Sequence, residues 1–239
     1  MSPAITARRS DGRRQPLSRE RILRAAIAVA DAGGHASLTI RSVAQLLEVR
    51  PMAIYHHVAN KGEILDGILD LVFAEIELPV PGGDWRAELS RRARSAREVL
   101  RRHPWAITLL QSGTAPGPAT LRHHDAVIGT LRGAGFTVTM TAHAYALLDS
   151  YVYGFAMSEA ALPVNGPETV AEVSAAMRRR QPLDDFPYLA EFSAEHIMRP
   201  DYDFGSEFGF GLELVLEGLA RSVRGAAGQA PPQQEQPPQ

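Results

Sequence analysis

Residues 37–61 constrain the fold more than any other stretch, because they predict two short helices joined by a tight corner. Thr39 is a good N-cap for the first helix, since its hydroxyl can accept a hydrogen bond from a free amide of the first turn. Residues 48–50 must turn the chain. Pro51 fits the first position of the second helix, where a missing N–H costs nothing. The stretch therefore predicts a helix-turn-helix.

The apolar residues of this unit predict which side of each helix faces inward. At helical spacing these inner positions are Val43, Leu46 and Leu47 in the first helix and Ile54 and Val58 in the second, and Ala44 is small enough to let another helix approach. The outward face of the second helix carries small, basic and hydrogen-bonding residues, which is what reading a DNA groove requires. The candidate DNA-binding residues are Thr39, Arg41, Arg50, Pro51, Met52, Ala53, Tyr55, His56, His57 and Lys61. A helix-turn-helix that serves packing alone is the competing interpretation.

The charge of the chain is divided along its length. Residues 1–62 carry ten basic against four acidic side chains, a net charge of +6. The whole chain has 25 basic and 27 acidic side chains, so residues 63–239 carry 15 against 23, a net charge of −8. A basic N-terminal unit on an acidic body favours a partner with phosphate charges at that end.

The remaining pattern predicts an all-α protein with four parts. Residues 1–16 form a basic arm, either an unstructured terminus or an extra DNA contact, and 17–62 form a three-helix DNA-binding domain. Residues 63–224 form a larger helical domain, and 225–239 are a low-complexity tail. Apolar spacing and Gly or Pro breaks predict helices at 19–32, 61–78, 85–102, 105–111, 118–133, 137–161, 168–180, 187–198 and 204–223.

Composition excludes several classes of protein. The 239 residues include no cysteine, so there is no disulfide framework and no thiolate chemistry, which suits the cytoplasm. No run of 18 apolar residues predicts a membrane span, and the N-terminus lacks the apolar core of a signal peptide. His123, His124 and Asp125 are the one cluster that suggests a metal. Adjacent helical residues point about 100° apart, so the two histidines cannot easily chelate one ion.

Catalytic motifs are missing as well, and we expect no enzyme. The sequence has no P-loop, no dinucleotide-binding glycine fingerprint, no nucleophile elbow and no zinc-protease motif. A helical metal-dependent enzyme is the weakest alternative. A constitutive architectural DNA-binding protein is another, although binding phosphates alone needs no acidic body of this size.

Residues 18–61 resemble the DNA-binding domain of the tetracycline repressor (TetR) family of bacterial regulators. The shared runs are SRERILRAAIAVADAGG, LTIRSVAQLLEV and PMAIYHHVANKGEIL. The later runs LRRHPW, LRGAGF, AYALLDSYVYGFAMSE and FGFGLELVLEGL resemble the effector domain of the branch nearest the tetracycline repressor, so the likeness extends over about residues 17–222. The family commonly has Gly where Glu48 stands. Either Glu adopts a positive φ there at a cost of roughly 1 kcal/mol, or the corner is built differently.

The resemblance implies a ligand-responsive repressor that a small molecule releases from a palindromic operator in double-stranded DNA. Helices 137–161 and 204–223, apolar on more than one side, would pair with their symmetry mates in a homodimer. Core helices of a monomer are the alternative. A two-fold dimer places its reading helices roughly 34–36 Å apart, one turn of DNA. A ligand between helices of the body would move helix 61–78 and swing the reading heads apart.

Candidate effector-binding residues fall on helices expected to converge, and they mix apolar surface with a few polar groups, as ligand sites do. They are His103, Trp105, Leu109, Gln111, His123, Val127, Tyr145, Leu148, Asp149, Tyr153 and Met177. The resemblance also assigns His103 to a magnesium ion that arrives with the drug. The acid expected on helix 137–161 is out of register, because Ser158 stands there and Glu159 follows. We therefore expect no cofactor and a hydrogen-bonding role for His103, and a magnesium ion that accompanies the effector is the alternative.

Overall fold

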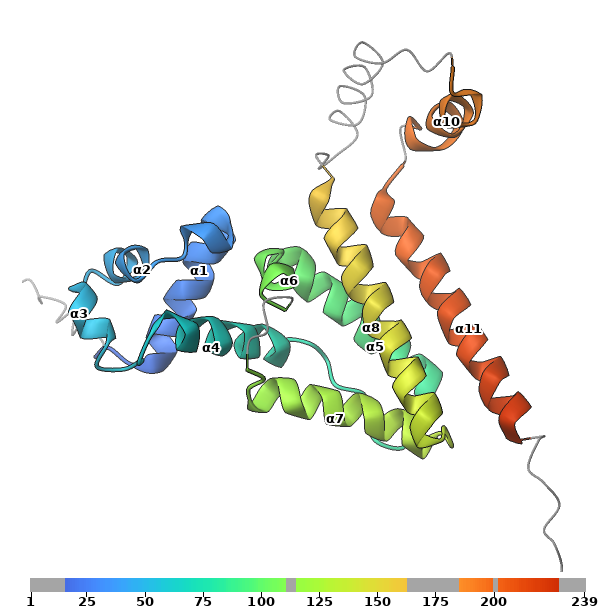
Figure 1. Cartoon of the computed structure of the whole chain (residues 1–239), viewed down its shortest axis with the longest axis horizontal. Helices are drawn as coiled ribbons and strands as arrows, with labels where there is room; N and C mark the ends of the chain where they lie inside the picture. The colour runs from blue at the N-terminus through green and yellow to red at the C-terminus, as the bar shows by residue number, and fades with distance from the viewer. Residues whose placement is uncertain (1–15, 111–114, 163–184, 200–201, 228–239) are drawn as a thin grey trace, which may run out of the picture. The chain divides into compact units, whose positions relative to one another are not determined.

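The computed structural model describes residues 16–110, 115–162, 185–199 and 202–227, and all regular structure within them is helical (Figure 1). The chain divides into two compact units, residues 1–64 and 65–239. The predicted helix 168–180, most of the predicted arm and tail, and the candidate ligand residues Gln111 and Met177 lie outside the described residues. No helix within the described residues is both long and apolar enough to cross a bilayer.

The first unit contains α1 (Arg19–Ser37), α2 (Ile40–Leu46), α3 (Pro51–Ile54) and the start of α4 (Lys61–Ala74). Ser18 caps α1 by accepting a hydrogen bond from the Arg21 amide at 3.3 Å. The backbone leaves helical geometry at Gly33 and Gly34, where the sequence predicts the end of this helix, before one further turn. Gly34 has φ 71°, which glycine adopts without strain.

The inner face of α2 differs from the sequence prediction. Val43 and Ala44 are buried, whereas the Leu46 side chain is 53% exposed. Helix α2 packs against α1, and its buried residues are Val43 and Ala44, so its buried stripe is centred between residues 43 and 44. Leu46 lies more than a quarter turn from that centre and so faces outward.

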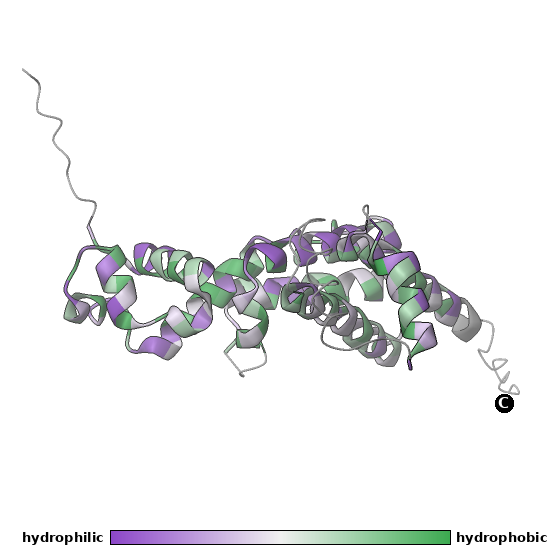
Figure 2. Cartoon of the chain, turned by 90° about the horizontal axis from the view of Figure 1, so that it is seen from above, coloured by the Kyte–Doolittle hydropathy of each residue, from purple (hydrophilic) through white to green (hydrophobic). Residues whose placement is uncertain are grey.

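The second unit begins within α4 and continues as a helical body. Its helices are α5 (Trp85–Arg102), α6 (Trp105–Leu110), α7 (Pro118–Gly133), α8 (Val138–Ala161), α10 (Pro187–Phe192) and α11 (Glu207–Ala227). Helix α8 packs against α5, α6, α7 and α11, and it runs beside α11 in Figure 1. Hydrophobic and hydrophilic residues are interspersed along the helices of both units (Figure 2).

Besides α1, three helices differ from the sequence prediction in their bounds or type. The connecting helix ends at Ala74 rather than residue 78. The helix predicted at 187–198 is α10 followed by a π-helical turn, Ser193–Ile197. The last helix starts with a 3₁₀ turn, Phe204–Ser206, and α11 continues to Ala227.

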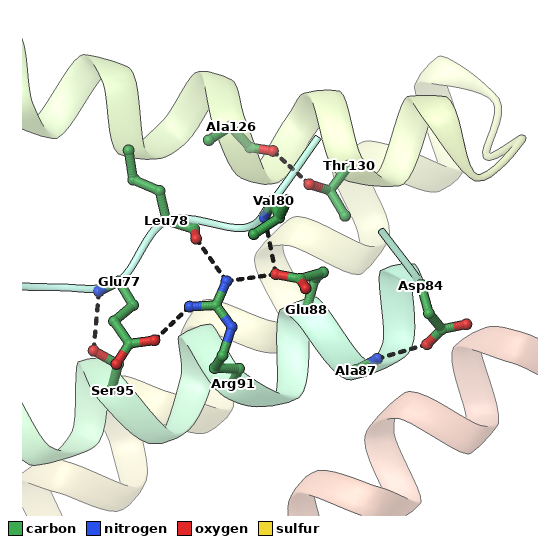
Figure 3. A network of polar contacts seen from close by, with 10 residues as sticks. All are labelled: Glu77, Leu78, Val80, Asp84, Ala87, Glu88, Arg91, Ser95, Ala126 and Thr130. Carbon is green, nitrogen blue, oxygen red and sulfur yellow. Dashed lines mark hydrogen bonds and ion pairs between the residues drawn. The ribbon is translucent and has the colours of Figure 1, made fainter. Parts of the chain in front are cut away.

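Contacts with α5 explain why α4 stops early (Figure 3). Arg91 donates to the Leu78 carbonyl at 2.8 Å and pairs with Glu77 and Glu88. The Val80 amide donates to Glu88 at 2.8 Å, and this bond, with Arg91, lowers the pKa of the Glu88 carboxyl. These bonds hold residues 77–80 as an extended connection along α5, which a continued helix would prevent.

An aromatic cluster joins α5, α8 and α11. Phe155 stacks on Phe204 with ring centroids 4.7 Å apart and meets Phe208 edge-on at 5.1 Å. The guanidinium of Arg97 lies 5.4 and 5.2 Å from the centroids of the Phe155 and Phe208 rings and pairs with Glu159. The cluster fixes α11 against the body.

Candidate functional site

The helix-turn-helix is held by a reciprocal cap. The Thr39 hydroxyl accepts from the Ser42 amide at 3.0 Å, and the Ser42 hydroxyl accepts from the Thr39 amide at 2.9 Å. Leu38, directly before the cap, is buried beneath it. This arrangement confirms Thr39 as the N-cap and fixes the direction in which α2 starts.

The corner between α2 and α3 requires an unusual backbone conformation. Glu48 has φ 54°, and it is the one non-glycine residue of positive φ among the described residues. The sequence predicts this strain, because the resembling family commonly has glycine here. Arg50 then caps α3 with extended backbone, and Pro51 is the first helical residue, as predicted.

Helix α3 and the turn that follows it, residues 51–58, present an outer face anchored by a buried inner side; α3 itself ends at Ile54, so Val58 lies beyond the helix in which the sequence placed it. Ile54 and Val58 are buried at 0% and 2% exposure, in agreement with the sequence prediction. Met52 is 70% exposed and Tyr55 45% exposed. Arg41, Arg50, Pro51, His56, His57 and Lys61 are also exposed, and Ala53 is half-buried. The outer face thus combines a flexible apolar side chain, an aromatic hydroxyl and several bases, and it carries no acid from residue 50 to 57.

The turn after α3 is fixed by Glu63. Its carboxylate accepts from the Ala59 amide at 2.8 Å and from Arg19 at 3.1 Å, and these bonds lower its pKa. The Asn60 side chain accepts from the Glu63 amide at 2.9 Å. The start of α4, with Lys61 exposed upon it, is therefore tied to the start of α1.

The second unit contains a buried polar cluster centred on Arg92 of α5. The Arg92 side chain is 1% exposed and forms an ion pair with Asp149 of α8 at 2.8 Å. Its Nε and Nη2 atoms lie 3.0 and 2.6 Å from Nε2 of His123 on α7. One buried cation thus joins three helices.

His123 is electrically neutral in this setting. Burial, followed by the charges of Arg92 and His124, lowers the pKa of its imidazole to about 3. Arginine has no acceptor and keeps its protons, so Nε2 of His123 must be the acceptor of both contacts.

Two tyrosines and a phenylalanine complete the cluster. The Tyr145 hydroxyl bonds with Nδ1 of His124, and Phe73 of α4 meets His123 edge-on at 5.4 Å. The Tyr153 hydroxyl is buried beside Arg92 and Asp149. Burial, followed by the charge of Asp149, raises the pKa of both tyrosines, so their hydroxyls stay protonated.

The structure therefore brings together four of the residues predicted for ligand binding: His123, Tyr145, Asp149 and Tyr153. His103 and Trp105 form a separate pair at the α5–α6 corner, with ring centroids 5.9 Å apart and Nε2 of His103 3.5 Å from Glu75. Leu109, Val127 and Leu148 are buried core residues.

Sequence reasoning missed Arg92, which is not among the predicted ligand-binding residues. A signal was present: Arg92 falls between Leu89, Ala93 and Ala96, so it shares their inner stripe.

Ser158 and Glu159, which stand where the resemblance would place a metal-binding acid, are engaged in other interactions. Both carboxylate oxygens of Glu159 accept from Arg97, and Ser158 is exposed and bonds the Gly154 carbonyl. Within the described ranges, no three histidine or acidic side chains gather as metal ligands would. The expectation of no cofactor stays a prediction.

An open hollow elsewhere on the body is a weaker ligand site. It is lined by Tyr188, Glu191, Phe192, Glu195 and His196, on α10 and the π-helical turn. Small-molecule sites usually bury most of the surface of their ligand. This hollow is open and lined by two acids, so it would leave most of a ligand exposed.

A second contact that the sequence did not predict joins α4 to α7. The Asp70 carboxylate accepts from the Thr120 amide at 2.8 Å, the Thr120 hydroxyl at 3.0 Å and the Ala119 amide at 3.3 Å. Asp66 accepts from the Ala115 amide at 3.2 Å. Asp70 therefore caps the start of α7, where the helix dipole favours negative charge, and Asp66 holds the chain just before it.

Comparisons with known proteins agree with this architecture. Residues 78–223 match the family model of the tetracyclin repressor-like C-terminal domain. The HTH-type transcriptional repressor DrrR1 of Streptomyces coeruleorubidus is 34% identical over 237 residues, 95% of this chain and 86% of that protein.

Solved structures are similar over the same span. Apo ActR from Streptomyces coelicolor has a TM-score of 0.72 and 26% identity, covering 89% of this chain and 99% of ActR. ActR in complex with actinorhodin has a TM-score of 0.69 and 26% identity, covering 87% of this chain and 99% of that one.

Proposed function

This chain belongs to the tetracycline repressor family of ligand-responsive transcriptional regulators, and we propose that it is a repressor released from a palindromic operator by a small molecule. The observation that carries the proposal is the capped helix-turn-helix with an acid-free outer face on α3. In this proposal the protein acts on DNA in the cytoplasm, and its buried polar cluster binds a ligand rather than catalysing a reaction.

The outer face of α3 reads the operator. Arg50 and Met52 are exposed where α3 begins, so they meet base edges, and changing either alters sequence preference. The Tyr55 hydroxyl and the Lys61 ammonium contact phosphates, which carry affinity but no sequence information. Thr39, Arg41, Pro51, Ala53, His56 and His57 complete the proposed contact surface.

The effector binds at the cluster of Arg92, His123, Tyr145, Asp149 and Tyr153. Buried polar groups among aromatic rings are what a small-molecule site supplies for orientation and specificity. ActR has been solved in complex with actinorhodin, which supports a small-molecule ligand for this chain as well. His103, Trp105, Leu109, Gln111, Val127 and Met177 are proposed as further contacts, and a metal ion accompanying the ligand is not part of the proposal.

Helix α4 transmits binding to the head. It begins in the first unit and ends in the second, where Asp66 and Asp70 hold the start of α7. Because His123 lies on α7, one turn beyond the residues that Asp70 contacts, a ligand that shifts α7 pulls on α4. Coupling of this kind is typically worth about 1–3 kcal/mol.

A homodimer places two heads on the operator. Phe210 and Leu214 are 70% and 56% exposed on the outer side of α11, and Leu147 and Met157 of α8 are also exposed. Large apolar side chains on the outer sides of two adjacent helices favour a partner helix pair. Leu214→Glu is expected to produce monomers in sedimentation experiments and to abolish operator binding. Leu121→Glu, at a similarly exposed position on α7, should leave the dimer intact.

Footprinting of the DNA flanking the gene tests the function. We expect protection of one short palindrome that a ligand reverses, whereas broad coating of DNA would indicate an architectural protein. Lys61→Ala should weaken binding to all DNA sequences, and it should reduce the slope of log binding constant against log salt concentration by about 1. Arg24→Ala is the matched control, because Arg24 is exposed but already pairs with Glu20. Equal affinity for a specific duplex and random competitor refutes the proposal.

A further inference from the structure

His123 is held in one tautomer by its neighbour. Arg92 directs two N–H donors at Nε2, 3.0 and 2.6 Å away, and a guanidinium can only donate. Nε2 therefore carries the lone pair. A neutral imidazole has a single N–H, which must then be on Nδ1. The side chain is 0% exposed, and Nδ1 has no hydrogen-bond partner among the residues that the structure describes.

A buried N–H without an acceptor is unfavourable, and a group that supplies the acceptor recovers that free energy. The structure also constrains the charge of such a group. Arg92 and Asp149 neutralise each other at 2.8 Å, and His123 and the tyrosines are uncharged. An anionic ligand group would add an unbalanced charge in a buried setting, which is costly.

The neighbouring rings define the rest of the ligand. Phe73 lies 5.4 Å from His123 and 6.0 Å from His124, and His124 lies 5.7 Å from Tyr145, measured between ring centroids. These rings come from α4, α7 and α8. Two of these contacts are edge-on and that of Phe73 with His124 is tilted, and a group of aromatic rings of this kind suits a planar aromatic molecule.

We propose that His123 is the specificity-determining donor of the effector site, and that the effector presents a neutral carbonyl oxygen on an aromatic frame to its Nδ1–H. The inference rests on the proposed effector site and adds the chemistry of the ligand. Arg92 acts as a positioning residue, because it fixes the tautomer without contacting the carbonyl.

Nitrogen NMR of the full-length protein, labelled with ¹⁵N-histidine, tests the tautomer directly. We expect His123 to show a protonated Nδ1 and an unprotonated Nε2 at pH 7, with its signals assigned by their loss in His123→Asn. A protonated Nε2 overturns the proposal.

Three probes with one ring frame test the ligand chemistry: 1-indanone, indane and indane-1-carboxylate. The ketone should bind about tenfold more tightly than the hydrocarbon, as one net hydrogen bond provides, and more tightly than the carboxylate. Binding should also shift the Nδ1 signal of His123. Absence of this preference, including failure of the ketone to bind, overturns the proposal, as does tighter binding of the carboxylate.

Matched variants separate the donor from the fold. His123→Gln keeps an acceptor near the Nε2 position but loses the donor at Nδ1, and the preference for the ketone should vanish. His123→Asn keeps a donor near Nδ1 and should retain part of the preference. His143→Gln, exposed on α8, should change nothing. A preference that survives in His123→Gln refutes the role of His123. Failure of the regulator hypothesis would appear separately, as absence of operator protection in footprinting.

Discussion

The Arg92–Asp149 pair allows a quantitative test of how the body is held together. At 2.8 Å and an effective dielectric constant of about 20, the attraction is about 6 kcal/mol. Removing two charges from water offsets most of that gain, so the pair as a whole contributes little to net stability. Breaking it is different. Asp149→Asn preserves shape but leaves the Arg92 charge, 1% exposed, without its counter-ion. We expect this variant to lose about 3 kcal/mol of unfolding free energy.

A double-mutant cycle separates the pair from its surroundings. Arg92→Met combined with Asp149→Asn removes both charges, and its stability should return to within about 1–2 kcal/mol of the parent. The assay is urea unfolding followed by helical circular dichroism at one fixed protein concentration, because oligomer stability depends on concentration. Glu20→Gln breaks a pair that is 68% and 74% exposed and should cost at most about 0.5 kcal/mol. A loss below about 1 kcal/mol for Asp149→Asn, or additive single effects, would refute the reasoning.

Three further predictions follow from single residues. Glu48→Gly should raise the unfolding free energy by about 0.5–1 kcal/mol, because it removes the backbone strain of a side chain at φ 54°. Glu48→Ala keeps the Cβ atom and should not stabilise the protein. Equal effects of the two variants in thermal unfolding would contradict the strain argument. The pKa of His123 is about 3 in the folded protein and near 6.5 in the unfolded chain. The neutral imidazole therefore makes its full contribution to the unfolding free energy above pH 6.5, and this contribution is lost as pH falls toward 3. Between pH 7 and pH 4, the unfolding free energy of the parent should fall more steeply than that of His123→Asn, by up to about 1.4 kcal/mol per pH unit. Parallel profiles of stability against pH for the two proteins would exclude a neutral buried imidazole. Asp70→Asn should lower the unfolding free energy by about 1 kcal/mol and make the release of DNA depend less on ligand concentration. Asp125→Asn, on the exposed side of α7, should do neither. If DNA release by ligand is unchanged in Asp70→Asn, Asp70 does not take part in the coupling.

The reading head could be predicted in detail from the sequence, because its determinants are local. The Thr39 cap, the positive φ at Glu48 and the proline at the start of α3 depend on residues within a few positions of one another. Leu46 was the exception. Its exposure depends on how α2 packs against α1, and spacing within α2 alone does not define that contact.

The effector site could be predicted only as a set of residue types. The sequence determined that α7 and α8 carry histidines, tyrosines and an aspartate on faces that can meet. Only the tertiary structure decided that Arg92 is buried among them, 57 positions from its counter-ion Asp149. Likewise, Asp70 caps a helix that starts almost 50 positions later. Caps and turns arise from bonds between near neighbours, so sequence order specifies them. A buried charge is tolerated only where distant segments supply its partners, and that arrangement exists only once the helices have packed.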